Sequence, residues 1–278
     1  MNLFLAALAF LAICLPTFAK ADDPATGDKL AWQDGPTSGA IGDVATINVP
    51  KGYEFLDATD TKKFLEMHHD IAGSNEYLLT PRNFSWFALF HFEPVGYVKD
   101  NETLDPTSLL KTVKNENAQG NEERKQRGWP TLSILGWWFK PQYDHNAKLL
   151  EWAFRVKNDA NNVEVVNYFT RVLGRRGVMD VNLVSLPGNI ASSEASLKTI
   201  LTGFSYDPGQ RYSEFKQGDK VAKFGLAALI AGGAAAVATK KGFWAVLAGS
   251  VAAAWKALLA AAAGVSAWFR ARFRKKQQ

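Results

Sequence analysis

Residues 136–186 read GWWFKPQYDHNAKLLEWAFRVKNDANNVEVVNYFTRVLGRRGVMDVNLVSL, and the predicted architecture of the domain rests on their pattern. Together with the five residues before them, they divide into four strand-like segments in which apolar residues alternate with other residues, at 131–139, 148–156, 163–173 and 178–186. The links PQYDHNA, KNDANN and GRRG are too short for parallel crossovers. The sequence therefore predicts an antiparallel meander at the centre of one domain.

Shorter segments complete the predicted domain. Further strands are expected at 44–49, 76–80 and 84–92. Helices are expected after Asp60 as N-cap, over 107–127 with Asp105 or Thr107 as cap, and over 192–201 with Ser192 or Ser193 as cap. The charged second half of the 107–127 helix is expected to project into solvent. The fold class is thus α+β: an antiparallel sheet of about six strands with two or three packed helices, followed by a C-terminal transmembrane anchor.

The ends of the chain differ in composition from this domain. Residues 3–15 form an apolar run that is short for a membrane span, and Ala19-Lys20-Ala21 follows it. This layout predicts a secretory signal peptide, with an uncleaved anchor helix as the alternative. The predicted segments are a signal peptide (1–21), an extended arm (22–42), an exported α+β domain (43–215), a small-residue juxtamembrane helix with a first span as the alternative (216–241), a transmembrane helix (242–269) and a basic cytoplasmic tail (270–278).

Charge is distributed unevenly along the chain. Residues 22–219 hold all 27 acidic residues and 21 Lys and Arg, a net charge of −6, whereas residues 220–278 hold ten Lys and Arg and no acid. The basic tail accompanies apolar residues, which indicates a lipid bilayer and not a nucleic acid as its partner. By the positive-inside rule a single span places this tail in the cytoplasm, with a helical hairpin as the alternative.

Sequence motifs for catalysis or metal binding are absent. His68-His69-Asp70 is the most metal-like string, but adjacent helical histidines diverge and no HExxH supports them. Cys14 is the single cysteine and lies in the predicted signal peptide, which leaves no disulfide or cysteine-based zinc site. Neither GAIG nor GRRG matches a nucleotide-binding loop, and no G-x-S-x-G elbow occurs. We predict no catalytic residue, no metal and no cofactor.

Two turns of the meander are candidate recognition sites. Around the first lie Trp137, Trp138, Tyr143, Asp144 and His145, aromatic and polar residues typical of binding patches. The alternative, which the pattern favours, is a hairpin whose aromatic residues pack across strands.

The second candidate turn is basic. Its arginines, which can recognise a carboxylate or phosphate, are Arg171, Arg175 and Arg176. A solvated turn, or a turn that faces anionic headgroups, explains them equally well.

Three stretches together resemble the bacterial DUF2167 family of uncharacterised membrane-anchored proteins. They are residues 136–156, residues 166–184 and GQRYSEFKQGDKVAKFGLAALIAGGAA at 209–235. The resemblance implies a Gram-negative, exported protein in the inner membrane, with residues 43–215 in the periplasm, and it supplies no activity. Family members tend to carry two prolines before the Tyr-Asp turn, where this chain has Lys140-Pro141. The meander and final helix are also similar to the PsbP-type sandwich.

Three functions remain open. The first is a non-enzymatic, membrane-anchored binding module for a protein or envelope component. The second is a tethered envelope hydrolase, which would bring titratable groups such as Asp144, His145, Glu151 and an arginine together in a pocket. The third is a ligand- or lipid-sensing domain with an enclosed apolar cavity. We favour the first.

Overall fold

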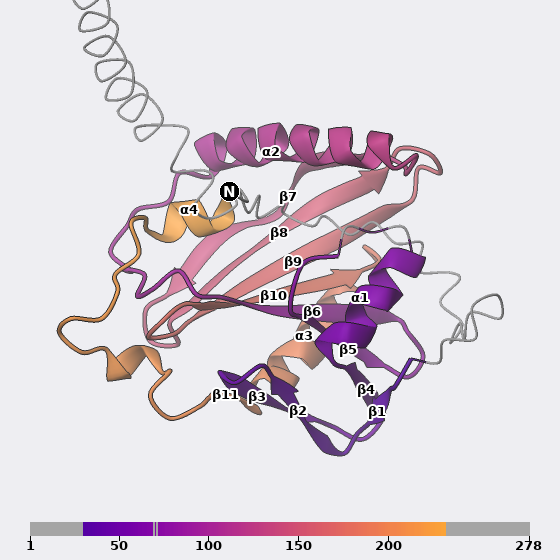
Figure 1. Ribbon diagram of the computed structural model, residues 1–278. Coiled ribbons are helices and arrows are strands. Elements are labelled where there is room, and N and C mark those ends of the chain that lie inside the picture. Colours follow the sequence, from indigo (N-terminus) through magenta and orange to yellow (C-terminus); the bar gives the residue numbers. More distant parts are fainter. Residues whose placement is uncertain (1–29, 69, 71, 232–278) are drawn as a thin grey trace, which may run out of the picture. The chain divides into compact units, whose positions relative to one another are not determined.

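The computed structural model describes residues 30–68, 70 and 72–231, which form an α+β fold around a large antiparallel sheet (Figure 1). In the order β1-β4-β5-β6-β10-β9-β8-β7, eight described strands make the main sheet, and β11-β3-β2 make a second one. The main-sheet strands are β1 Gln33–Asp34, β4 Tyr53–Leu56, β5 Glu76–Pro81, β6 Trp86–Glu93, β7 Leu132–Asp144, β8 Leu149–Asn158, β9 Glu164–Leu173 and β10 Val178–Ser185. The second sheet contains β2 Thr37–Ile41, β3 Ala45–Val49 and β11 Phe204–Tyr206.

The described helices lie on both faces of the main sheet (Figure 1). They are α1 Ala58–Met67, α2 Pro106–Gln126, α3 Ile190–Leu201, the short α4 Leu226–Ile230 and the 3₁₀ turn η2 Tyr212–Glu214. The predicted α+β class and antiparallel sheet are confirmed, but the main sheet has eight strands and not about six. The difference arises from β1 and β4, which are too short to show an alternating pattern.

The meander that the sequence predicts forms the middle and one edge of the main sheet. Strands β7, β8, β9 and β10 pair antiparallel in chain order. Strand β10 then pairs with β6, and these two are the paired strands of this sheet that lie furthest apart in the sequence. The edge strand β7 is longer than predicted because it continues through Pro141 to Asp144, and its register with β8 shifts three times. A proline fits this position because one side of an edge strand needs no backbone donor.

Alternation along the strands divides the core into two layers. On one face, Ala153, Tyr168, Val181 and Phe90 pack against α3 and the second sheet. On the other face, Trp152 and Phe169 stack with centroids 5.2 Å apart, and Phe87 contacts α1 through Phe64 at 6.4 Å. Burial on both faces explains why apolar residues of these strands occupy positions on both sides of the sheet.

The second half of the predicted N-terminal arm is part of the folded domain. Residues 33–41 form β1 and β2, whereas the sequence predicts an extended arm over 22–42. Trp32 packs edge-on against Phe64 and Phe84, at 6.0 and 5.4 Å. The Ala31 N–H donates to the Asp60 carboxylate at 2.7 Å. These contacts between residues distant in sequence hold the arm, so its polar composition alone could not reveal them.

Helix α1 begins one turn earlier than predicted. Its N-cap is Asp57, whose Oδ1 accepts the Asp60 N–H at 3.0 Å. Asp60, the predicted cap, is buried in the first turn and binds Lys63 as well as Ala31. Both positions suit an acidic residue, because the exposed N–H groups and positive end of the dipole extend over the first turn.

Helix α3 also has a different cap from the one predicted. It begins after Asn189, which makes no side-chain capping bond. The Ser192 hydroxyl donates to the Asn189 carbonyl at 2.8 Å, and the Ser193 hydroxyl lies 2.9 Å from that of Ser185. Ser193 thus joins the helix to β10 and does not cap it.

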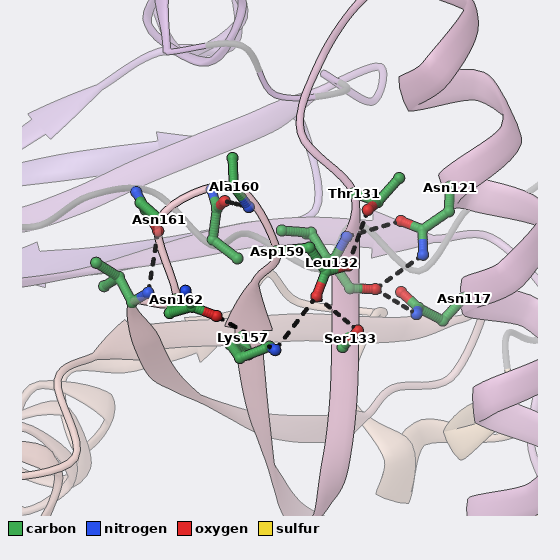
Figure 2. Close-up of polar contacts among 12 residues, drawn as sticks. Asn117, Asn121, Thr131, Leu132, Ser133, Lys157, Asp159, Ala160, Asn161 and Asn162 are labelled. Atoms are coloured by element: carbon green, nitrogen blue, oxygen red, sulfur yellow. Dashed lines mark hydrogen bonds and ion pairs between the residues drawn. The ribbon is translucent and has the colours of Figure 1, made fainter.

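Helix α2 packs along the sheet, contrary to the prediction that its second half projects into solvent. Figure 2 shows Asn117 and Asn121 directed at the start of β7. Both side-chain amides donate to the Leu132 carbonyl at 2.8 Å, and the Asn121 Oδ1 accepts the Leu132 N–H at 2.9 Å. Asn121 therefore pairs with the free edge of β7 as a peptide group of another strand would.

A buried ion pair joins α2 to the segment after α1. Arg124 Nη2 lies 2.6 Å from Asp70 Oδ1, and both side chains are almost fully buried. Such a pair is costly to break, because removal of one partner leaves the other charge buried. Asp70 of the His68-His69-Asp70 string thereby has a structural partner in Arg124.

The chain after β11 follows an irregular course along the domain. We call residues 209–225 the strap; they contain η2 but no α-helix, and α4 follows them. The sequence predicts a helix over 216–241, of which the described part is helical only in α4. None of the described helices is both long and apolar enough to cross a membrane. The predicted signal peptide, the 242–269 span and the basic tail lie outside the described residues.

Replacing Asn121 tests whether its amide protects the β7 edge. We expect Asn121→Ala to lower the free energy of unfolding by about 1 to 3 kcal/mol, because the Leu132 N–H loses its partner. The exposed Gln126→Ala in the same helix serves as the control and should change it by less than about 0.5 kcal/mol. Urea denaturation measures both, and equal effects of the two changes would contradict the assignment.

Candidate functional site

The two turns that the sequence singles out lie at the same end of the main sheet. The β7–β8 turn occupies residues 145–148, and the β9–β10 turn occupies residues 174–177. The pairing of Leu149 with Val172 and of Val178 with Leu173 sets them side by side. The Leu173 N–H donates to the Lys148 carbonyl at 3.1 Å, which links the turns directly. We call this region the turn end of the sheet.

The β9–β10 turn binds the strap. Arg175 Nε and Nη2 each lie 2.7 Å from an oxygen of Asp219, and Nη1 donates to the Gly209 carbonyl at 3.3 Å. The Arg175 N–H donates to the Gln210 carbonyl at 2.8 Å. The bidentate hydrogen bonds from Arg175 lower the pKa of Asp219 to about 2. Arg175 therefore holds the strap and is not available to an external ligand.

The chain before α2 completes the turn end. Residues 94–98 pair with the strap, since Tyr97 N–H donates to the Lys220 carbonyl at 2.8 Å and Ala222 N–H to the Tyr97 carbonyl at 2.9 Å. The Tyr97 ring lies between the rings of Tyr212 and Phe215, each with its centroid 4.3 Å away. Phe215 remains 39% exposed at the outer side of this stack.

Asp100 is the polar centre of the turn end. Its Oδ2 accepts the Tyr143 hydroxyl at 2.9 Å and the Lys148 ammonium at 2.8 Å, and His145 Nδ1 lies 3.9 Å away. Burial disfavours the ionised form of Asp100, but the hydrogen bonds from Lys148 and Tyr143 outweigh it and lower its pKa. Lys148 also lies 5.3 Å from the centroid of the Tyr212 ring. The Asp100 carboxylate is thus ionised and paired.

A second set of polar residues crosses the face of the sheet that α1 and α2 cover. Glu76 of β5, His91 of β6, Asp180 of β10 and Arg171 of β9 are successive register partners across four neighbouring strands. We call these four residues the titratable row. Arg171 Nε lies 2.7 Å from Asp180 Oδ1, and its guanidinium lies 5.0 Å from the Trp152 ring centroid.

Burial shifts the pKa values in the titratable row. It raises the pKa of Asp180 to about 8, with Arg171 opposing the shift and Glu93 and Glu76 adding to it. Burial also raises the pKa of Glu76 to about 6, against a hydrogen bond from the Gly73 N–H, and lowers the pKa of His91. The row therefore combines two carboxyl groups whose pKa values are raised with an imidazole whose pKa is lowered. Such separated pKa values are also what acid–base catalysis requires.

Several of the predicted recognition residues have structural partners. The Trp137 indole N–H donates to the Pro106 carbonyl at 3.1 Å, and its ring stacks on Phe154 at 4.4 Å. Asp144 accepts the N–H groups of Asn146 and Ala147, at 2.7 and 3.0 Å, and so forms the turn itself.

Other predicted residues stay open to solvent. Trp138 is 44% exposed, and Arg176 and His145 are exposed, with the His145 ring edge-on to Tyr143 at 4.8 Å. The structure brings Tyr143, His145, Arg175 and Arg176 to the turn end but places Arg171 in the titratable row. A recognition role for any of them stays a prediction.

The catalytic set that a hydrolase would need at the first turn does not assemble. Glu151 lies on the opposite face of the sheet from Tyr143, where it contacts the Tyr168 hydroxyl and lies 3.4 Å from Lys198 of α3. Among the described residues, no cluster of three or more His, Cys, Asp or Glu is arranged to hold a metal ion. His68 Nδ1 instead lies 2.7 Å from the Phe64 carbonyl.

Sequence reasoning singled out Arg171 but missed Asp100 and the other three residues of the titratable row as parts of a site. Asp100 and Tyr143 are 43 residues apart, and His91 has no acidic neighbour in sequence closer than Glu93. Strand register joins the members of the titratable row, whereas the segment between β6 and α2 brings Asp100 to Tyr143. The RYSEF element in the third family-like stretch did carry a signal, since Tyr212 and Phe215 belong to it.

Comparison with known proteins assigns the chain to a family. The family described as "Protein of unknown function (DUF2167)" matches residues 33–263. The chain belongs to this family. The match begins with β1 and includes the strap and the titratable row, so both belong to the DUF2167 region of the chain.

A solved structure shows a distant likeness to this DUF2167 protein. The solution structure of cyanobacterial PsbP (CyanoP) from Synechocystis sp. PCC 6803 is 10% identical, with a TM-score of 0.34, and the match covers 64% of this chain and 92% of that one. The search of curated proteins found no match.

The raised pKa of Asp180 predicts a pH-dependent stability. A carboxyl group whose pKa is higher in the folded state binds its proton more tightly when the chain is folded. Its contribution to the free energy of unfolding is therefore full below the unfolded pKa, near 4, and is lost as the pH rises toward 8. We expect Asp180→Asn to reduce the loss of stability between pH 5 and pH 8 by about 1 to 3 kcal/mol.

Urea denaturation at the two pH values measures this difference. The exposed Glu66→Gln of α1 is the control and should leave the pH dependence unchanged. An Asp180→Asn protein with the same pH dependence as the unmodified chain would show that Asp180 is ionised throughout this range.

Proposed function

We propose that this protein is a non-enzymatic binding module, tethered to the bacterial inner membrane with its folded domain in the periplasm, that captures a protein partner. The predicted signal peptide and the 242–269 span support export and tethering, and the acid-free basic tail supports a cytoplasmic C-terminus. The partner is held at a strip on β7 formed by Leu135 and Trp138, which we call the β7 strip.

Exposure of the β7 strip is the observation that carries this proposal. Leu135 and Trp138 are 39% and 44% exposed, although most large apolar side chains of the described domain are buried. Tryptophan is enriched among the residues that dominate protein interfaces, because one side chain buries a large rigid area. Each lies at a register shift of the edge strand, where the extra residue has no partner on β8 and its side chain is left open to a binding partner.

The β7 edge favours recognition by side chains over strand addition. Its register with β8 shifts between Ile134 and Gly136, between Trp137 and Phe139, and between Phe139 and Gln142. Pro141 removes one backbone donor, and Asn121 pairs with Leu132 at the start of the strand. These features prevent a partner strand from extending the sheet. We therefore expect a partner that covers Leu135 and Trp138 with its own side chains.

A second function, hydrolysis of an envelope component, is favoured by the titratable row. The row places Asp180 and Glu76, whose pKa values are raised, beside His91, whose pKa is lowered, on neighbouring strands. The two functions make different demands on the protein. A hydrolase would lose its activity in His91→Gln, whereas a binding module would keep its partner in that variant and lose it when Trp138 is replaced.

Photo-crosslinking in cells tests the β7 strip. With a photoreactive amino acid at Leu135 of the full-length protein, we expect a discrete adduct whose yield falls tenfold or more in Trp138→Ser, because a buried interface tryptophan contributes about 2 kcal/mol or more. The same probe at Ala160, in the β8–β9 turn, is the control and should give no such adduct. An adduct at Leu135 that is insensitive to Trp138→Ser would contradict the proposed strip.

A further inference from the structure

We infer that the strap is a membrane-docking surface that lies on an anionic lipid bilayer. This inference rests on the proposed function, since it requires that the chain be tethered to a membrane. It adds a second contact between the folded domain and the lipid, separate from the apolar tail.

Charge is the first argument. The strap carries four exposed cations, Arg211, Lys216, Lys220 and Lys223, within a domain whose residues 22–219 are net acidic. Its two acids are already engaged within the domain. Asp219 is bound by Arg175, and Glu214 Oε2 accepts the N–H groups of Gly209 and Arg211 at 2.8 Å. Neither strap carboxylate is therefore free to neutralise the four exposed cations.

Apolar exposure is the second argument. Four large apolar residues of the described domain are exposed, and Phe215 and Val221 of the strap are two of them, at 39% and 38%. Both adjoin Tyr97, Phe215 through its ring and Val221 through a backbone bridge. Lys216 follows Phe215 and Lys220 precedes Val221 in sequence. Apolar side chains bordered by lysines suit the headgroup boundary, where the apolar parts enter and the ammonium groups meet phosphate.

Continuity of the chain is the third argument. The strap leads through α4 to residue 231, and the predicted span begins eleven residues later, at 242. Even fully extended, that connection reaches about 40 Å, and a compact one reaches much less. A membrane is thus the nearest large surface that this tether brings to the strap. Each cation held at an anionic surface strengthens the attraction roughly fivefold, so the three strap lysines together strengthen it roughly a hundredfold.

The strap is held in a fixed shape before it meets a membrane. Arg175 fixes Asp219 and Gly209, the backbone of residues 220–222 pairs with Tyr97, and the Tyr212 hydroxyl donates to the Val98 carbonyl at 2.9 Å. Docking therefore requires little ordering of the chain, which removes one of the main costs of binding.

Spin-label accessibility in vesicles tests the inference with the full-length protein. The label is placed at the exposed Gln217, between the lysines, in a Cys14→Ser background. On phosphatidylcholine vesicles that contain phosphatidylglycerol, we expect the label to be shielded from a water-soluble nickel chelate and exposed to oxygen. A label at Ala160, in the β8–β9 turn at the opposite end of the meander, should stay fully open to the chelate.

Charge reversal supplies the matched control. The triple variant Lys216→Glu, Lys220→Glu, Lys223→Glu should lose the shielding at position 217, as should the unmodified protein in high salt. Reversal of three exposed lysines elsewhere, at positions 51, 62 and 125, should leave it intact. Shielding that is equally strong on pure phosphatidylcholine, or that survives the strap variant, would overturn the electrostatic docking.

Flotation of the same vesicles separates this inference from the proposed function. If the protein floats with the vesicles and the strap label remains as open to the chelate as the Ala160 label, docking is wrong and the tether stands. If the protein does not float at all, the tether is wrong, and the docking inference fails with it.

Discussion

The arrangement of the turn end depends on the ion pair between Arg175 and Asp219. Arg175 lies in a four-residue turn between two central strands, so its position is set by the register of β9 and β10. From there its side chain and backbone bind three points of the strap, at Gly209, Gln210 and Asp219. The adjacent Arg176 carbonyl accepts the Gly96 N–H at 2.9 Å. One turn thus fixes two segments that are about 110 residues apart in sequence, and the Tyr97 aromatic stack follows from their pairing.

The surfaces of the domain differ in composition. The face under α3 and the second sheet is a closed apolar core, whereas the opposite face contains the titratable row and the Asp70–Arg124 ion pair. The β7 strip lies on the edge strand of the main sheet, and the strap lies at the turn end. A tethered binding module needs both a contact for its partner and a way to orient that contact relative to the membrane. In the proposed function the β7 strip provides the first and the strap provides the second, and they lie at different parts of one sheet.

The sequence predicted the parts of this fold that depend on local patterns. The β7–β10 meander follows from four alternating segments with short links, and α2 follows from Asp105, which accepts the Thr107 N–H. It could not predict β1, the burial of Arg124 or the packing of α2, because these depend on contacts between distant residues such as Trp32 with Phe84. For the site, composition identified Tyr143 and Arg175, but their partners Asp100 and Asp219 emerge only when the chain is folded. The titratable row has no local signal, since it runs perpendicular to the strands.

Hydrogen exchange of the strap tests the central claim, that Arg175 holds this segment on the sheet. In the full-length protein we expect Arg175→Ala to accelerate amide exchange across residues 209–223 and at Tyr97, because the hydrogen bonds to Asp219 and Gly209 are lost. Exchange in the strands β8 and β9 should change little, since their backbone bonds do not involve this side chain. Unchanged protection of the strap in Arg175→Ala would contradict the account, as would a uniform loss of protection throughout the sheet.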